Sequence, residues 1–131
     1  MINKSSLIAI KALAELANLP PGKCEGAVSL AKKIDAPANY LSKTLQSMAD
    51  RGLIVSQKGK GGGFRIDKDP STISLFDVVE QVEDMGKWSK CFLGRKRCLD
   101  SSPCSMHERW KQVRETNIEF LKSIRLSEIK G

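Results

Sequence analysis

The sequence predicts a mainly α-helical fold with one small β-hairpin and a long C-terminal helix. Two short stretches with the apolar spacing of helices precede a hairpin whose tip is rich in glycine and lysine. Near the end of the chain, apolar residues recur in steps of three and four, which is typical of a helix with a partner-facing seam. With 131 residues, 40% of them hydrophobic, the chain holds material for one modest core.

Three helices are expected before the hairpin. Leu7, Ile10, Ala14 and Ala17 recur at helical spacing and predict a helix over residues 4–18, which Pro20-Pro21-Gly22 ends. A second, short helix is expected over 29–34. A third is expected over 38–51, because Leu41, Leu45 and Met48 fall on one face behind the turn at Pro37.

The hairpin follows the third helix directly. Gly52 stands where that helix would stop, and Leu53-Ile54-Val55 reads as the start of a strand. The tip Lys58-Gly59-Lys60-Gly61-Gly62-Gly63 and the returning strand Phe64-Arg65-Ile66 come next, and Asp69-Pro70 closes the unit. Two short helices followed by a basic hairpin give the order of a winged helix-turn-helix.

The C-terminal half is expected to hold two more helices. Ser74 and Asp77 form a capping box that opens a helix through about Val82. Residues 85–104 lack periodicity. The last helix, over about 104–126, carries a seam at Trp110, Val113, Asn117, Phe120 and Ile124, which predicts a homodimer in which Asn117 fixes the register. The expected division is therefore a DNA-binding domain over 1–84, a cysteine-containing loop over 85–104, and a dimerisation helix with its tail over 105–131.

Charge and cysteine content narrow the class of protein. The net charge is +7, and the basic residues gather in 29–66 and in 87–97, which favours nucleic acid as a partner before a membrane surface. No stretch has the length and apolarity of a membrane span, and no secretory signal is seen, so we expect a cytoplasmic protein with no membrane partner. In that compartment the four cysteines favour metal binding or redox chemistry over structural disulfides.

The third predicted helix and the hairpin have the chemistry of a DNA reader. Asn39, Ser42, Lys43 and Gln46 share the outward face of the helix, where short polar side chains can reach base edges in the major groove. Tyr40 and Ser29 are placed near the DNA backbone. Lys58, Lys60 and Arg65 supply cations for phosphates, and Gly61 and Gly62 let the hairpin backbone approach the duplex. Each feature alone is more often a solvated face or a flexible turn; their order and shared charge favour DNA.

These residues resemble a known family. Tyr40-Leu41-Ser42-Lys43-Thr44-Leu45, Arg51-Gly52-Leu53-Ile54 and Lys58-Gly59-Lys60-Gly61-Gly62-Gly63-Phe64-Arg65-Ile66 are similar to the Rrf2 family of transcription regulators, over essentially the whole chain. The resemblance implies a dimeric winged-helix protein that binds double-stranded DNA at an inverted-repeat operator. Many relatives have proline within the glycines of the hairpin tip, where this chain has Lys60, which adds charge and removes stiffness.

A cluster of sulfur and nitrogen ligands precedes the last helix. Cys91-x6-Cys98-x5-Cys104-x2-His107 brings three cysteines and the single histidine together, and such ligands suit an iron–sulfur cluster or zinc. The spacing is not that of a zinc finger. Cys24 is expected to be a small buried apolar residue. The absence of a Cys-x-x-Cys pair argues against a thiol oxidoreductase, and we expect a protein that is not an enzyme.

Within the family, the resemblance is to the subgroup of iron–sulfur cluster regulators. Cys91, Cys98, Cys104 and His107 match that subgroup's three cysteines and histidine, which implies an iron–sulfur cluster, [2Fe–2S] before [4Fe–4S], that modulates DNA binding. In the nitric-oxide-sensing subgroup an aspartate of the first helix is the fourth ligand, and Ser6-Leu7-Ile8-Ala9 here contains no acid. The alternative is a winged-helix regulator with a zinc-bound or metal-free, thiol-sensing loop, as in family members that regulate cysteine metabolism and carry no cluster.

Overall fold

The computed structural model describes residues 2–94, 101 and 103–130. Five α-helices and one two-stranded sheet lie within these residues: α1 Lys4–Ala17, α2 Ala27–Ile34, α3 Ala38–Asp50, β1 Val55–Gln57, β2 Gly63–Arg65, α4 Leu75–Val79 and α5 His107–Ser123. Short 3-10 turns cover Pro70–Thr72, Met85–Ser89 and Leu126–Glu128. The expected fold class, mainly α with a small β-hairpin, is confirmed.

Helix α1 is the central element of the core. Asn3 caps it through its side chain, which accepts a hydrogen bond from the Ser6 backbone N–H, and its buried face includes Ala9, Ile10 and Leu13. Leu7, expected on the apolar face, is 44% exposed. The buried face is rotated toward Ser6 because this hydroxyl, not Leu7, faces inward and donates a hydrogen bond to the buried Glu83.

Helices α2 and α3 pack against each other and against α1. Helix α2 begins at Ala27, two residues before the predicted start, because Gly26 supplies the extended N-cap. Asp35 ends it in a left-handed conformation at φ 54°, and its backbone N–H donates to Ala31 O. Leu41, Leu45 and Met48 of α3 are buried as expected.

The hairpin is antiparallel and pairs Val55 with Arg65, Ser56 with Phe64 and Gln57 with Gly63. The strand begins at Val55, so the prediction that it starts at Leu53 was wrong: Leu53 and Ile54 are buried in the core before the ladder begins. Backbone hydrogen bonds between Glu25 and Phe64, 3.0 and 2.9 Å long, join the hairpin to the segment before α2.

The C-terminal half differs from its prediction at the element ends. The capping box of Ser74 and Asp77 is present, but α4 ends at Val79 instead of Val82. Met85–Ser89 forms a 3-10 turn within the stretch that shows no periodicity in the sequence. Helix α5 spans His107–Ser123, shorter than the predicted 104–126. Ile124 follows the helix and packs against the protein's own core, so its place on a partner-facing seam was wrong.

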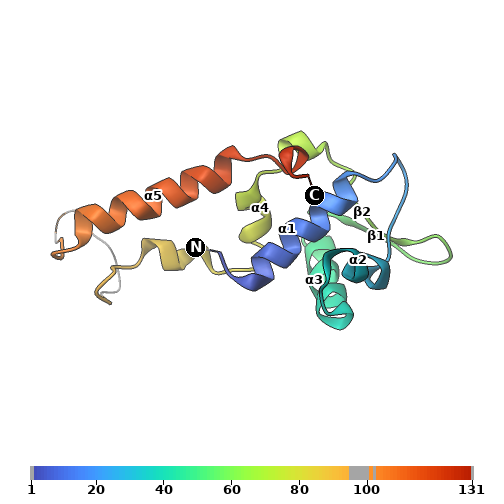
Figure 1. Cartoon of the computed structure of the whole chain (residues 1–131), viewed down its shortest axis with the longest axis horizontal. Coiled ribbons are helices and arrows are strands. Elements are labelled where there is room, and N and C mark those ends of the chain that lie inside the picture. The colour runs from blue at the N-terminus through green and yellow to red at the C-terminus, as the bar shows by residue number, and fades with distance from the viewer. Residues whose placement is uncertain (1, 95–100, 102, 131) are drawn as a thin grey trace.

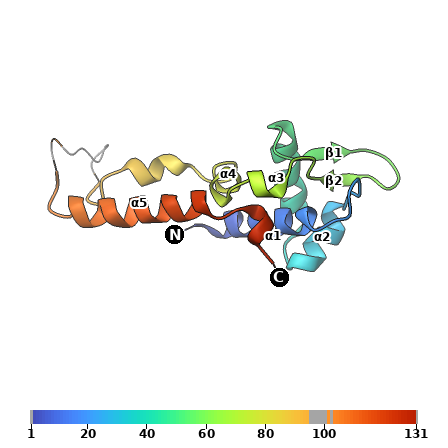
Figure 2. The same cartoon turned by 90° about the horizontal axis from the view of Figure 1, so that it is seen from above.

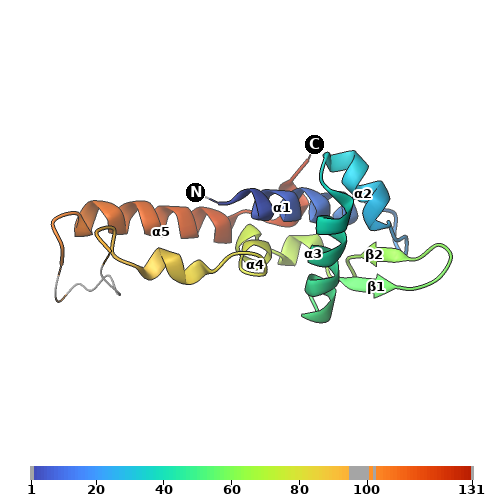
Figure 3. The ribbon, with the colours of Figure 1, turned by 90° about the horizontal axis from the view of Figure 1, so that it is seen from below.

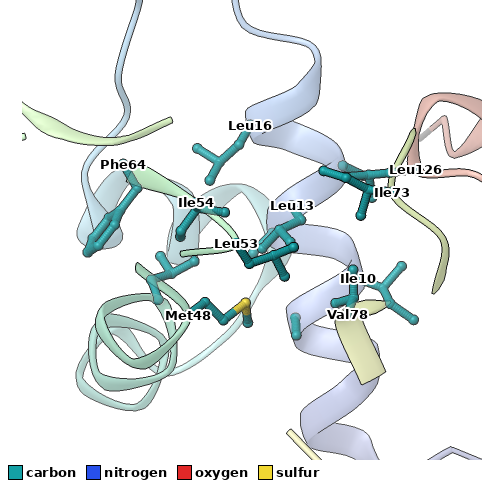
Figure 4. Close-up of a cluster of buried hydrophobic side chains, with 14 of the residues drawn as sticks. Ile10, Leu13, Leu16, Met48, Leu53, Ile54, Phe64, Ile73, Val78 and Leu126 are labelled. Atoms are coloured by element: carbon teal, nitrogen blue, oxygen red, sulfur yellow. The ribbon is translucent and has the colours of Figure 1, made fainter. Parts of the chain in front are cut away.

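The molecule is elongated, with the hairpin at one end and the start of α5 at the other (Figure 1). The views of Figures 2 and 3 agree that the Met85–Ser89 turn runs alongside α5. The main core lies where α1, α3, the hairpin, α4 and the C-terminal turn converge, around Leu13, Met48 and Leu126 (Figure 4). Each such side chain stabilises the fold by about 1.5–3 kcal/mol on burial. Among the described residues, no helix has the length and apolarity to cross a membrane.

Candidate nucleic-acid interface and cysteine site

The outward face of α3 carries the predicted base readers. Asn39, Ser42, Lys43 and Gln46, called the reading face below, are all exposed, and so is Tyr40. They follow the helical repeat opposite the buried Leu41, Leu45 and Met48. The side-chain amide of Gln46 donates to Asp50 Oδ1 at 3.1 Å, which orients the side chain along the helix.

The hairpin, called the wing below (residues 55–65), projects beside α3 (Figure 3). Lys58, Lys60 and Gly61 are exposed at its tip, whereas Arg65 is half-buried at its base, in the wall of a hollow beneath the α1–α2 connection. Of the three cations predicted to contact phosphates, only the two lysines therefore lie at the exposed tip of the wing.

Gly62 has a structural reason to be glycine. A Cβ there would lie 2.1 Å from Gln57 O and 2.9 Å from Gly59 O, so a side chain would collide with the wing's own backbone. The backbone N–H of Gly62 donates to Gly59 O at 3.0 Å, which closes the turn. The prediction that this glycine serves close approach to DNA is not needed to explain it.

Ser29 lies on the exposed side of α2, but its hydroxyl is engaged within the protein. Ser29 Oγ donates to Glu25 Oε2 at 2.7 Å, and Lys33 Nζ donates to Glu25 Oε1 at 2.9 Å. A hydroxyl has one hydrogen to donate, so Ser29 cannot donate to a phosphate while this bond is present. Burial by itself raises the pKa of Glu25, but the hydrogen bonds from Lys33 and Ser29 outweigh it and lower that pKa below 4.5.

Glu25 was not among the residues predicted from the sequence to lie at a functional site. Its carboxylate is 8% exposed, and its backbone pairs with Phe64 of the wing. A glutamate before a glycine in a loop gives no signal of burial, because its position depends on a strand nearly forty residues later. Its neighbour Cys24 is only partly buried and its thiol lies 3.4 Å from Gln57 Oε1 of the wing, so the expectation of a buried apolar cysteine was wrong.

Two of the predicted metal ligands meet in the structure. The thiol of Cys91 donates to Cys104 Sγ, with the two sulfur atoms 3.4 Å apart. Cys91 is buried and Cys104 partly exposed. Cys104 precedes α5 instead of lying on it, and its carbonyl oxygen accepts a hydrogen bond from the His107 backbone N–H at 3.1 Å.

The other two predicted ligands are placed differently. His107 is 3% exposed at the first residue of α5, and its Nε2 lies 4.0 Å from Glu108 Oε1. Cys98 lies outside the described residues, as do Arg95, Lys96 and Arg97 of the predicted basic run. Within the part of the chain that the structure describes, no three metal-ligating side chains form a ready site.

An aromatic cluster of Trp88, Phe92 and Trp110 holds the cysteine-bearing segment against α5. The rings of Trp88 and Trp110 stack with centroids 6.1 Å apart, and Phe92 packs against Trp110 at 5.6 Å. The indole N–H of Trp110 donates to Lys90 O at 2.9 Å. Cys91 lies between these contacts in the sequence, so the cluster fixes its backbone beside the start of α5.

Residues 2–130 match the family model of Rrf2, described as "Iron-dependent Transcriptional regulator". The chain belongs to the Rrf2 family. The HTH-type transcriptional regulator IscR of Vibrio vulnificus is 31% identical over 91 residues, which cover 70% of this chain and 54% of that relative. The resemblance drawn from the wing and α3 motifs is thus confirmed.

Solved structures of Rrf2-type regulators share the fold. CymR (YrzC), the global cysteine regulator of B. subtilis, superposes with a TM-score of 0.81 at 22% identity, over 98% of this chain and 94% of that one. IscR of T. potens gives 0.78 at 20% identity, over 98% and 84%. This Rrf2 protein is accordingly a winged-helix, DNA-binding transcription regulator and not an enzyme.

Proposed function

We propose that this Rrf2 protein reads its operator with the reading face of α3 and holds the DNA backbone with the wing. The observation that carries the proposal is the exposure of Asn39, Ser42, Lys43 and Gln46 on one helical face beside a projecting wing. Such side chains can donate to and accept from base edges, and each good contact contributes about 1–3 kcal/mol of discrimination.

The test is the ratio of specific to random DNA affinity. Replacing Ser42 and Lys43 together by alanine removes two readers from an exposed face, so the fold should persist. We expect the ratio to fall by at least tenfold, at about 1.4 kcal/mol per factor of ten. The matched control is Ser47→Ala, also exposed on α3 but outside the reading face. An unchanged ratio in the double variant would show that another surface reads the sequence.

We further propose that Cys91, Cys98, Cys104 and His107 hold an iron–sulfur cluster, [2Fe–2S] before [4Fe–4S]. Two thiolates on one tetrahedral metal at about 2.3 Å lie about 3.8 Å apart, and the 3.4 Å between Cys91 and Cys104 is close to that spacing. The soft donor set suits iron, and the similarity to IscR proteins supports the same choice. A bound cluster would supply a centre that responds to oxidants, nitric oxide or iron supply.

The chain's own residues suggest how the site connects with the rest of the protein. Cys91 lies two residues after the Met85–Ser89 turn, Cys104 lies three residues before α5, and His107 is the first residue of α5. Ligation would tie these two segments together at the end of the molecule opposite the wing. The division into residues 1–84, 85–104 and 105–131 is proposed on this basis.

Spectra of ligand variants test the cluster. Cys98→Ser should abolish visible absorbance after anaerobic purification, while His107→Ala should leave a more labile cluster because three thiolates remain. Cys24→Ser is the matched control and should keep the full absorbance. A colourless wild-type protein carrying stoichiometric zinc would establish the alternative, a zinc-bound regulator.

We also propose a homodimer through α5. Val113 and Phe120 are 51% and 47% exposed and lie two turns apart on one helical face with Asn117 between them. Phe92, 59% exposed, lines a surface hollow together with Trp110 and Val113 and so extends this apolar surface toward the start of α5. A second copy of the chain would cover these groups, and its two-fold symmetry would match an inverted-repeat operator.

A further inference from the structure

The geometry points to a redox-active dithiol: Cys91 and Cys104 close to an intramolecular disulfide when the metal-free protein meets a hydroperoxide. The two sulfurs are 3.4 Å apart, and a disulfide bond is about 2.05 Å long, so closure requires an approach of roughly 1.4 Å. The inference does not depend on the proposed cluster.

The two thiols differ in exposure, which assigns their order of reaction. Cys104 is partly exposed and can meet a small oxidant, whereas Cys91 is 7% exposed and faces Cys104. Redox-sensing sites commonly pair an accessible cysteine with a neighbouring one that resolves it. Cys104 is therefore the thiol that is oxidised first, and Cys91 the thiol that resolves it.

The chemistry balances with hydrogen peroxide as the oxidant. Cys104 Sγ attacks one peroxide oxygen; the O–O bond breaks, an S–O bond forms, and the other oxygen leaves as water, giving a sulfenic acid. Cys91 Sγ then attacks Cys104 Sγ; the S–S bond forms, the S–O bond breaks, and the hydroxyl leaves as water with the Cys91 proton. Two thiols and one peroxide yield one disulfide and two waters.

The aromatic cluster keeps the two thiols together without a metal. Trp110 stacks on Trp88, contacts Phe92 and donates to Lys90 O, so it restrains the backbone on both sides of Cys91. Holding two reacting groups in place raises their effective concentration. Trp110 is therefore a positioning residue for disulfide closure.

The disulfide also bears on the proposed cluster, and this consequence rests on the proposed function. A sulfur in a disulfide cannot ligate iron, so oxidation removes two of the four proposed ligands at once. Cluster binding and disulfide closure then exclude each other, and a dithiol reductant is needed before the site can bind iron again.

The test uses the full chain, purified with reductant and chelator and then treated with hydrogen peroxide. Peptide mass spectrometry without reduction should find Cys91 linked to Cys104, with Cys24 still a thiol. Cys24→Ser, the matched control, should leave product and rate unchanged. A link from Cys98 to either cysteine, or sulfinic acid at Cys104 with no link, would overturn the assignment.

The positioning residue is tested by closure rates. Trp110→Ala should slow closure roughly tenfold, and Phe92→Ala, which removes one ring from an exposed position, should slow it less. The rate of alkylation of Cys24 should not change in either variant. Closure of Trp110→Ala and Phe92→Ala at the wild-type rate would overturn the role of the aromatic cluster. Failure of these tests would leave the cluster spectra unaffected, so the two proposals can fail separately.

Discussion

Glu83 ties the start of α1 to the segment that leads to the cysteines, and its replacement gives a quantitative prediction. Its Oε2 accepts hydrogen bonds from the Asn3 backbone N–H at 2.8 Å and from Ser6 Oγ, and its Oε1 accepts from Lys87 Nζ. The side chain is almost fully buried. In Glu83→Gln one oxygen remains for Asn3 and Ser6, but an amide N–H₂ faces the Lys87 ammonium, and two donors oppose each other.

The size of the effect follows from the lost interaction. A hydrogen bond to a charged group contributes about 1.5–3 kcal/mol, and Lys87 is 40% exposed, so solvent screening places the loss at the lower end. We expect Glu83→Gln to lower the free energy of unfolding by about 1.5 kcal/mol and Tm by roughly 5 °C. Glu80→Gln, an exposed change on the same segment, is the control and should stay within about 0.5 kcal/mol.

The contribution of Glu83 to the stability of the fold depends on pH in a definite direction. Burial by itself raises the pKa of Glu83, but the hydrogen bonds from Lys87, Ser6 and Asn3 outweigh it and lower that pKa below 4.5. The carboxylate therefore stabilises the fold in full above pH 4.5, and this contribution is lost as the pH falls through the lowered pKa of the folded state. Urea unfolding at several pH values should show the wild type and Glu83→Gln converging toward low pH. Equal stability near neutral pH, or a difference that does not change with pH, would show that the ionised Glu83 carboxylate does not stabilise the fold.

Three further changes have defined outcomes. Gly63→Ala should lower the free energy of unfolding by about 2–4 kcal/mol, because φ is 135° and a Cβ would lie 2.5 Å from Glu25 O. The control Gly59→Ala, at φ 92° with nothing within 4 Å of the added Cβ, should lower it by about 1 kcal/mol. Equal losses of stability in thermal unfolding would argue against the close approach of Gly63 to Glu25. Removing Lys60 should reduce the slope of log K against log salt by roughly one unit, and an unchanged slope would separate the wing tip from the phosphates. Phe120→Glu should convert the proposed dimer to a monomer, as measured by light scattering. Glu119→Gln, an exposed change on α5, is the control. If Phe120→Glu remained a dimer, the interface would lie elsewhere.

The sequence predicted the winged-helix part well because its signals are local. The apolar spacing of α3, the capping box of Ser74 and Asp77, and the glycine-rich wing tip each define their element from neighbouring residues. Apart from the shifted ends of helices and strands, the errors concern contacts between distant segments. In α1, Ser6 and not Leu7 faces the protein interior because it donates a hydrogen bond to Glu83. Ile124 does not lie on the seam because it packs against the protein's own core. The Ser29 hydroxyl donates its hydrogen bond to Glu25.

Of the two candidate sites, the reading face depends on local sequence and the cysteine site depends on contacts between distant segments. The reading face follows from helical periodicity alone, so its exposure could be predicted from α3. The contact between Cys91 and Cys104 depends on the packing of Trp110 against Trp88 and Phe92. Periodicity could not predict that packing, because the Met85–Ser89 turn has no regular repeat.

Control of DNA binding by the cluster is tested most simply by measuring operator affinity with cluster-loaded and cluster-free protein at the same salt concentration. Because Cys91 and Cys104 lie on two segments that ligation would connect, we expect loading to change the specific affinity at least fivefold, the lower range of allosteric coupling. The salt slope, which reports the phosphate contacts of the wing, should change less. Identical affinity and identical sequence preference in the two forms would contradict the proposal that the cluster controls DNA binding.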